Sequence, residues 1–241
     1  MKRIVLLSLS LIFLFSSCRF IGGRHIRGNG NVTTRERTTG SFQQVEVSGA
    51  LEVYVRQDSA QKPVRVETDE NLQDFVEVSE SNGTLYIGTV ENANLDPTRG
   101  VKIYVSSPSY RGLRVSGAST LKSENKLMLN EQLDLDLSGA SEIKLSVKSP
   151  KVVAEVSGAS SVEMAGETRD ARLNGSGASH FRCYDLMSEN TSVDISGACS
   201  AEVFASVKLD IQASGASEIR YKGAASVSQD VSGASSIRKV D

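Results

Sequence analysis

The sequence predicts an all-β fold, a right-handed parallel β-helix-like solenoid with irregular, wider coils at its N-terminal end. The main observation is a short motif, Ser-Gly-Ala, that recurs along the chain. It begins at Ser48, Ser116, Ser138, Ser157, Ser176, Ser196, Ser214 and Ser232. From Ser116 onward the steps are 22, 19, 19, 20, 18 and 18 residues, a period typical of one supersecondary unit stacked on the next. No stretch after residue 17 shows a sustained helical pattern of apolar side chains.

Residues 1–17 are predicted to be a lipoprotein signal peptide that precedes the folded part. Lys2 and Arg3 form a positive start, and an apolar segment and two small residues lead to Cys18. The Cys after the small residues resembles the lipobox of bacterial lipoproteins, which implies cleavage before Cys18 and lipidation of Cys18. An ordinary signal peptide with an incidental Cys is the alternative. A membrane-spanning helix is not expected, because it would need about 20 apolar residues and the apolar segment, residues 4–15, has about twelve.

The expected location is the cell envelope, as an outer-membrane lipoprotein whose lipid on Cys18 makes the membrane a partner. Arg19 rather than an Asp follows Cys18, and by resemblance to known sorting rules this favours the outer membrane. No acidic cluster follows, so the periplasmic face is favoured over the cell surface.

Residues 18–39 are predicted to form a flexible basic tether, and residues 40–241 a single β-solenoid domain. The tether is rich in Gly, Asn and Thr, and its arginines are either contacts for anionic lipid or parts of a plain solvated linker. These arginines are Arg19, Arg24, Arg27, Arg35 and Arg37. Within the domain, residues 40–110 are expected to form irregular front coils and residues 111–241 the regular coils.

The charge balance argues against nucleic acid as a partner. Without Lys2 and Arg3, 25 of the 27 basic residues stand against 29 acidic ones, whereas a nucleic-acid surface needs a basic face. The chain has no Trp and only 5% aromatic residues, so platforms that stack on sugar rings are not expected.

The residues around each motif alternate between apolar and polar, which predicts a strand with one buried face on either side of the corner. The residue three positions before each corner Ala is mostly apolar, and the residue four positions before it is polar. If successive coils stack, these polar residues form a column on the surface. That column contains Arg114, Asp136, Glu155, Asn174, Asp194, Gln212 and Asp230. A charged column follows the corner and contains Lys122, Lys144, Glu163, Arg182, Glu202, Arg220 and Arg238. Because coil length varies and right-handed crossovers are the rule between parallel strands, we expect a right-handed coil.

The corner itself has a simple interpretation. Gly permits positive φ at a sharp bend, and the two serines can hydrogen-bond backbone groups there. Ala is expected to fit where the coil interior narrows. The small residues are therefore predicted to be a packing requirement, and a flat face for a ligand is the alternative.

Two cysteines remain in the predicted domain. Cys199 takes the place of the second Ser of its corner, and Cys183 follows Phe181 in an apolar column. Four positions along a strand correspond to about 13 Å, beyond the ~7 Å that a disulfide spans. Both thiols are therefore expected to be free, with Cys183 buried.

The front half shows the same β pattern with irregular spacing. Asn82-Gly83 is typical of a hairpin turn, and residues 91–100 are expected to form an exposed loop. At the other end Gln229, Arg238 and Lys239 interrupt the apolar columns, which is expected of the end of a solenoid.

The chain resembles the family described as auto-transporter adhesin, head GIN domain. The resemblance rests on three segments: Phe42-Gln43-Gln44-Val45-Glu46-Val47-Ser48-Gly49-Ala50, Val101-Lys102-Ile103-Tyr104-Val105 and Leu113-Arg114-Val115-Ser116-Gly117-Ala118-Ser119, with the corners that follow. It covers residues 37–241. It implies a right-handed β-helix-like solenoid at a bacterial envelope, and it brings no catalytic motif to transfer.

We therefore expect a non-catalytic, lipid-anchored envelope protein that binds protein or glycan, acts in adhesion, or has a structural role, without a cofactor. The alternative is a polysaccharide-active β-helix enzyme whose carboxylates bind calcium. Asp136, Glu155 and Asp194 are the candidate ligand or cation face, because they stand in one polar column. Self-association through an uncapped strand edge is a third possibility.

Overall fold

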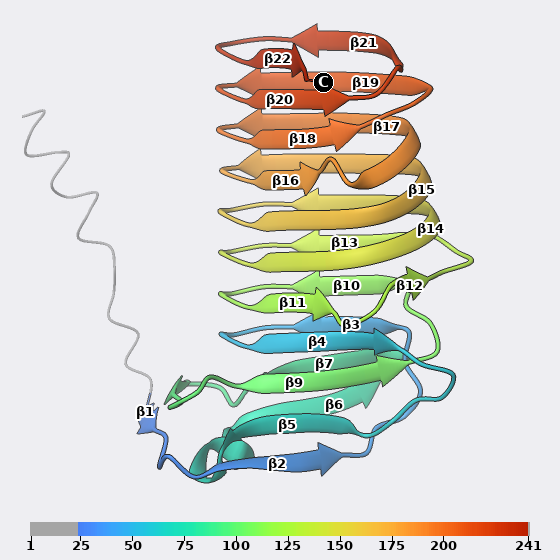
Figure 1. Ribbon diagram of the computed structural model, residues 1–241. Helices are drawn as coiled ribbons and strands as arrows, with labels where there is room; N and C mark the ends of the chain where they lie inside the picture. Colours follow the sequence, from blue (N-terminus) through green and yellow to red (C-terminus); the bar gives the residue numbers. More distant parts are fainter. Residues whose placement is uncertain (1–23, 241) are drawn as a thin grey trace, which may run out of the picture.

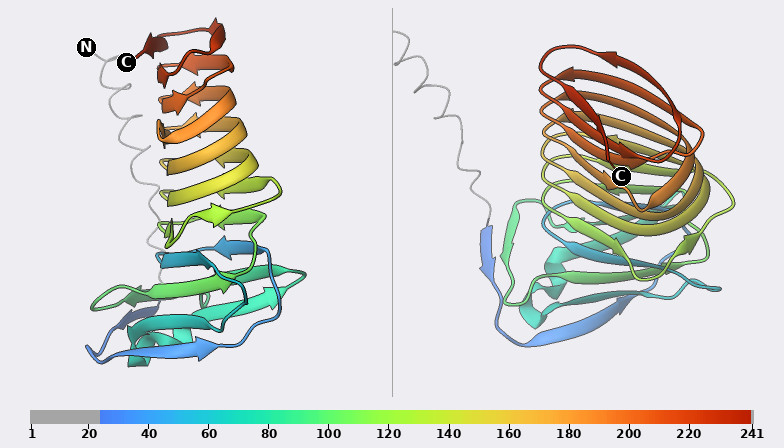
Figure 2. Two further views of the ribbon diagram at one scale, coloured as in Figure 1. Left: turned by 45° about the vertical axis from the view of Figure 1, so that its right-hand side comes forward. Right: turned by 45° about the horizontal axis from the view of Figure 1, so that its top comes forward.

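The computed structural model describes residues 24–240, which form a right-handed parallel β-solenoid of about six turns on a base of wider layers (Figure 1). The turns lie directly over one another above the base (Figure 2). The predicted fold class is confirmed, including the irregular N-terminal coils. The predicted signal peptide and Cys18 lie outside the described residues.

The base and the first turn combine antiparallel and parallel pairing. β2, β5 and β9 form an antiparallel layer, and β6 and β7 form a hairpin. β3 then pairs in parallel with β7, and β4 with β9, which starts the solenoid. The bounds are β1 Arg24–Arg27, β2 Val32–Arg37, β3 Gln44–Val47, β4 Glu52–Gln57, β5 Val64–Asp69, the 3₁₀ helix η1 Glu70–Phe75, β6 Val76–Ser81, β7 Thr84–Thr89, β8 Ala93–Asp96 and β9 Lys102–Ser107.

The regular turns contain β10 to β22, and the strands of successive turns pair in parallel. Each turn has one strand on a back sheet, a tight corner, and one strand on a front sheet; the corners stack at the left of Figure 1. The bounds are β10 Gly112–Val115, β11 Thr120–Ser123, β12 Leu127–Met128, β13 Leu133–Leu137, β14 Glu142–Val156, β15 Ser161–Gly177, β16 His180–Cys183, β17 Leu186–Gly197, β18 Ser200–Phe204, β19 Lys208–Gly215, β20 Glu218–Lys222, β21 Ser226–Val231 and β22 Ser236–Lys239.

The register between turns is the one that alignment on the motif predicts. Lys144 pairs with Glu163, and Glu202 pairs with Arg220. The charged groups of these pairs lie 3.3 Å and 3.7 Å apart, respectively. Exposed ion pairs of this kind contribute at most about 1 kcal/mol each, so their main effect is to disfavour a shifted register.

The corners stack backbone on backbone. The glycines of the seven regular corners have φ between +74° and +98°, a region that costs other residues free energy. The Ala159 N–H donates to the Gly139 carbonyl at 2.8 Å, and the corresponding bond joins every later corner to the one below it. A Cβ added to Gly158 would lie 2.4 Å from the Gly139 carbonyl oxygen. Glycine is therefore required both by the bend and by the stacking.

The orientation of the corner Ala differs from the prediction. The Ala side chains of the corners lie on the outside, whereas the second Ser of the motif is buried in the coil interior. Its hydroxyl donates a hydrogen bond to a backbone carbonyl of the same corner; for example, Ser141 Oγ donates to the Ser138 carbonyl at 2.7 Å. The second Ser is thus the residue that fits the narrow interior, because its hydroxyl finds a backbone acceptor there.

The cysteine prediction is confirmed. Cys183 and Cys199 are free and buried. Cys199 Sγ lies 3.2 Å from the Ser196 carbonyl and replaces the hydroxyl contact of the corner serines. Burial raises the pKa of the Cys183 thiol to about 12, so this thiol stays protonated at neutral pH.

A large side chain and a missing one compensate each other in the core. Gly175 stands where the other corners have an apolar residue, and a Cβ there would lie 2.6 Å from the Phe181 ring. Phe181 is 1% exposed, so its ring fills the space that a larger residue 175 would take. This exchange keeps the interior close-packed.

The prediction that residues 18–39 form a flexible tether is wrong for residues 24–39, the part that the structure describes. β1 pairs with β8, and β2 pairs with β5 at the edge of the base. Arg35 binds Asp74 at 2.7 Å, and Arg37 donates to the Gln73 carbonyl at 3.2 Å. A half-buried edge strand such as β2 contains many polar residues, and for this reason the sequence of residues 24–39 resembled that of a linker.

The other front-half predictions are largely confirmed. β6 and β7 form the hairpin, with φ of +52° at Asn82 and +75° at Gly83. Residues 91–100 are mostly exposed, but they contain β8, which sequence reasoning missed. At the C-terminal end Gln229 stacks on Ile211, as expected, while Val227 and Val231 are 36% and 39% exposed. The last turn is seen from above in Figure 2.

The glycine stacking can be tested with a matched pair of substitutions. Gly83 and Gly158 have φ of +75° and +76°, but only Gly158 faces backbone atoms within 4 Å. We expect Gly83→Ala to lower the free energy of unfolding by about 1 kcal/mol, the cost of positive φ. Gly158→Ala adds steric overlap and is expected to cost about 2–4 kcal/mol. Urea denaturation measures both, and equal losses would show that the corners do not depend on close stacking.

Candidate functional site

The predicted polar column is assembled as a continuous ladder on the back sheet. Arg114 pairs with Asp136, and Asp136 pairs with Glu155. Asn174 and Asp194 follow in the next two turns. The structure therefore brings the three predicted residues Asp136, Glu155 and Asp194 into one line, with Asn174 between the last two. Successive residues are separated by one strand spacing, about 4.8 Å.

Two hollows lie along this ladder and share Asp136 and Glu155, so they form one groove. Their volumes are about 380 Å³ and 310 Å³. We call this surface the polar groove. Its polar side chains are Gln44, Arg111, Arg114, Asp134, Asp136, Glu155, Ser157, Asn174, Ser176 and Asp194. The groove thus offers both hydrogen-bond donors and acceptors at regular intervals.

The charges of the polar groove are unevenly distributed along it. Arg114 lies between two carboxylates, 3.9 Å from Glu46 and 4.0 Å from Asp136. Arg111 pairs with Glu131. The guanidinium groups stand at the lower end, and the carboxylates of Glu155 and Asp194 have no such partner within the described residues. The same part of the chain contains no group of three His, Cys, Asp or Glu placed to hold a metal ion.

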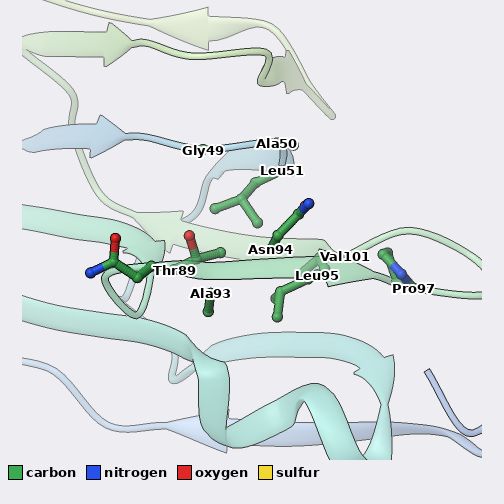
Figure 3. A pocket seen from close by; sticks show the side chains of 10 residues that line it. Gly49, Ala50, Leu51, Thr89, Ala93, Asn94, Leu95, Pro97 and Val101 are labelled. Carbon is green, nitrogen blue, oxygen red and sulfur yellow. The ribbon is translucent and has the colours of Figure 1, made fainter. Parts of the chain in front are cut away.

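A separate hollow of about 350 Å³ lies beneath the first corner, between Gly49–Leu51 and strand β8 (Figure 3). Figure 3 shows Gly49, Ala50 and Leu51 above Ala93 and Leu95. We call it the corner hollow. Sequence reasoning missed it because it is formed by segments that are about 45 residues apart in the chain and belong to the irregular coils.

Asp69 fixes the loop that borders the corner hollow. This fully buried carboxylate accepts hydrogen bonds from the Thr98 N–H and hydroxyl, both at 2.8 Å, and from the Gly30 N–H at 2.7 Å. Burial by itself would raise the pKa of Asp69, but these hydrogen bonds outweigh it and hold the pKa below its ordinary value. Asp69 therefore ties the turn after β1 and residue 98 to the base.

Sequence reasoning also missed an aromatic pair on the front sheet. The Tyr54 and Tyr104 rings stack with centroids 5.2 Å apart, and the Arg65 guanidinium lies 4.8 Å from the Tyr104 centroid. A hydrogen bond to the Glu52 carboxylate raises the pKa of Tyr54 to about 12. Both tyrosines follow an apolar residue at the same offset in β4 and β9, which is the signal that would have found them. Because the rings cover one another, they do not form an open platform for a sugar.

The polar groove lies on the outer face of the back sheet and is lined by polar side chains from successive turns. No helix among residues 24–240 is long and apolar enough to cross a membrane. The fold and the groove define a β-solenoid that presents a regular polar surface.

The chain belongs to the family described as "Putative auto-transporter adhesin, head GIN domain", whose model matches residues 41–225. The resemblance inferred from the sequence is thereby confirmed. A search of curated proteins found no match.

Several solved structures share the fold. A "putative adhesin" from Bacteroides fragilis NCTC 9343 is 19% identical, with a TM-score of 0.84 over 89% of this chain and 100% of that one. A "putative lipid binding protein" from Parabacteroides distasonis ATCC 8503 is 24% identical, with a TM-score of 0.73 over 90% and 100%. A "putative adhesin" from Parabacteroides merdae ATCC 43184 is 21% identical, with a TM-score of 0.71 over 90% and 99%.

The role of Asp69 predicts a specific pH dependence. Because its folded-state pKa is depressed, the carboxylate stabilises the fold fully above its unfolded pKa of about 3.9, and this contribution is lost as the pH falls through the lower folded pKa. We expect Asp69→Asn to lower the free energy of unfolding at pH 7 by about 2 kcal/mol, and to reduce the loss of stability below pH ~4.

Urea denaturation at pH 7 and at several values below pH 4 measures both effects. Asp230→Asn is the control, because Asp230 is exposed in the last turn. Identical pH profiles for wild type and Asp69→Asn would contradict this role of the carboxylate.

Proposed function

We propose that this protein is a lipid-anchored, non-catalytic binding module of the cell envelope whose polar groove binds a glycan chain. The observation that carries the proposal is the line of hydrogen-bonding side chains, Arg114, Asp136, Glu155, Asn174 and Asp194, in consecutive turns. A chain of hydroxyl-bearing units can exchange hydrogen bonds with such side chains along its length. The adhesin description of the family agrees with a binding role at the envelope.

The composition of the polar groove favours a glycan over a protein partner. Most of its lining side chains are polar, and the apolar ones, Leu135, Val153 and Val156, include no aromatic ring. Protein interfaces instead depend on buried aromatic and aliphatic anchors. Charged groups such as Glu155 are exposed, so a hydrated, polar ligand costs less desolvation than an apolar one.

Glycan-array binding of the intact chain tests the proposal. We expect Asp136→Asn with Glu155→Gln to weaken binding of the recognised glycan by about tenfold or more, since each lost charge-assisted hydrogen bond corresponds to about 1.5–3 kcal/mol. Glu163→Gln is the matched control, because Glu163 lies on the front sheet. Unchanged affinity in the double variant, or capture of envelope proteins without any glycan signal, would contradict the proposal. Repeating the assay with added calcium tests the cation-face alternative.

The anchor is a separate part of the proposal. Lipid on Cys18 would hold the protein at the membrane, and the lipobox-like residues before Cys18 support this lipidation. Arg19 favours the outer membrane, and the lack of an acidic cluster after Cys18 favours its periplasmic face. We expect wild type to incorporate a labelled fatty acid and to partition into detergent, and Cys18→Ser to do neither. Cys199→Ser is the control, because Cys199 is buried in a corner. Labelling of Cys18→Ser at the wild-type level would refute the anchor. Digestion of the wild-type protein by protease added to intact cells would refute the periplasmic location.

A further inference from the structure

The corner hollow marks the place where the stack of corners ends. In the regular part, each corner rests on the corner of the turn below. Beneath the first corner, residues 90–101 connect β7 to β9 and run outward through β8 instead of forming a tight bend. The space that a further corner would occupy is therefore left open as the hollow of about 350 Å³.

One backbone hydrogen bond of the ladder is missing at this point. Ala118 N–H donates to the Gly49 carbonyl at 2.7 Å, and Ala140 N–H donates to the Gly117 carbonyl at 2.8 Å. Ala50 occupies the same position in the first corner, but within residues 24–240 its N–H has no acceptor. A hydrogen-bond donor that is paired in every other turn thus remains available beside the hollow.

The lining of the corner hollow is apolar with a few neutral polar groups. Leu51, Leu95, Pro97 and Val101 supply apolar surface, and Thr89 supplies a hydroxyl. Figure 3 shows the Asn94 amide next to Leu51. None of the lining residues is charged. The volume lies in the usual range for sites that hold small molecules.

The frame of the corner hollow is held by contacts outside it. β8 pairs with β1 over four residues, from Arg24 and Ala93 to Arg27 and Asp96. Asp69 holds Thr98, next to the lining residue Pro97. Leu51 itself is 3% exposed. A site built from segments fixed in this way is largely pre-formed, which reduces the entropic cost of binding.

We propose that the corner hollow binds an uncharged apolar molecule that carries an amide or ester carbonyl, and that this carbonyl accepts the hydrogen bond from Ala50 N–H. The carbonyl takes the place of the glycine carbonyl that the missing corner would have supplied. A carboxylate is disfavoured, because no cationic side chain lines the hollow to offset its desolvation. The site is distinct from the polar groove, and its occupancy is independent of glycan binding.

A titration followed by amide NMR tests the proposal at a single atom. The probe is octanamide, added to the Cys18→Ser chain so that neither lipid nor detergent competes for it. We expect the Ala50 amide proton to shift downfield in a saturable manner as the hydrogen bond forms. The Ala118 amide, already bonded to Gly49, is the internal control and is expected to shift much less. N-acetyl-leucine methylamide as a second probe distinguishes a peptide from an acyl chain as the source of the carbonyl.

Sodium octanoate tests the charge argument and is expected to bind about tenfold more weakly than octanamide, or worse. Ala93→Phe fills the hollow and is expected to weaken octanamide binding by about tenfold or more, whereas Ala178→Phe, on the exposed surface of a regular corner, is expected to leave it unchanged. An Ala50 amide that does not respond to saturating octanamide would overturn the proposal, and this result with the Cys18→Ser chain decides it even if the chain that also carries Ala93→Phe does not fold. Equal binding of octanoate and octanamide would likewise overturn it.

Discussion

The structure depends on the close stacking of one corner on the next. The hydrogen bond from each corner Ala N–H to the Gly carbonyl below continues the sheet ladder through a bend, where ladders usually stop. This contact is possible only without a Cβ, because an added Cβ would lie 2.4–2.7 Å from that carbonyl oxygen in the regular corners. Once the corners are superposed, the register of each strand relative to the strand below it is fixed. This register determines which side chains point into the interior and which point to the surface.

Both candidate sites follow from this constraint in different ways. The polar groove exists because residues one turn apart must stand one above the other, so that Asp136, Glu155 and Asn174 form a line although they are about 19 residues apart in the chain. The corner hollow exists because the constraint ends at Ala50, where no further corner lies below. A regular surface suits an extended ligand, whereas the interruption of the regularity leaves a local hollow and a backbone N–H without an acceptor among the described residues.

The same constraint explains how the fold is kept at low sequence identity. The B. fragilis structure is 19% identical and still superposes with a TM-score of 0.84. A solenoid needs small residues at its bends and apolar residues at alternate positions, and it tolerates exchange within the apolar set as long as volume is conserved. Gly175 and Phe181 illustrate this, because a missing side chain in one column is compensated by a ring from another. The outward residues are under no such restriction, so ligand specificity can differ between members of one fold.

The sequence by itself determined the repeat, the register of the regular coils within residues 111–240, the free cysteines, the hairpin at Asn82-Gly83 and the column that contains Asp136, Glu155 and Asp194. These features depend on local periodicity, which is visible along one chain. The prediction that the corner Ala points inward was wrong, because periodicity does not give the direction of a side chain at a bend. The assignment of β1 and β2 to a tether was wrong, because an edge strand has a largely polar sequence. Only the tertiary structure decided the stacking of Tyr54 on Tyr104, the anchoring of the Thr98 loop by Asp69 and the corner hollow. Each joins segments of the irregular front coils that are about 30 to 50 residues apart, where no repeat fixes which residues meet.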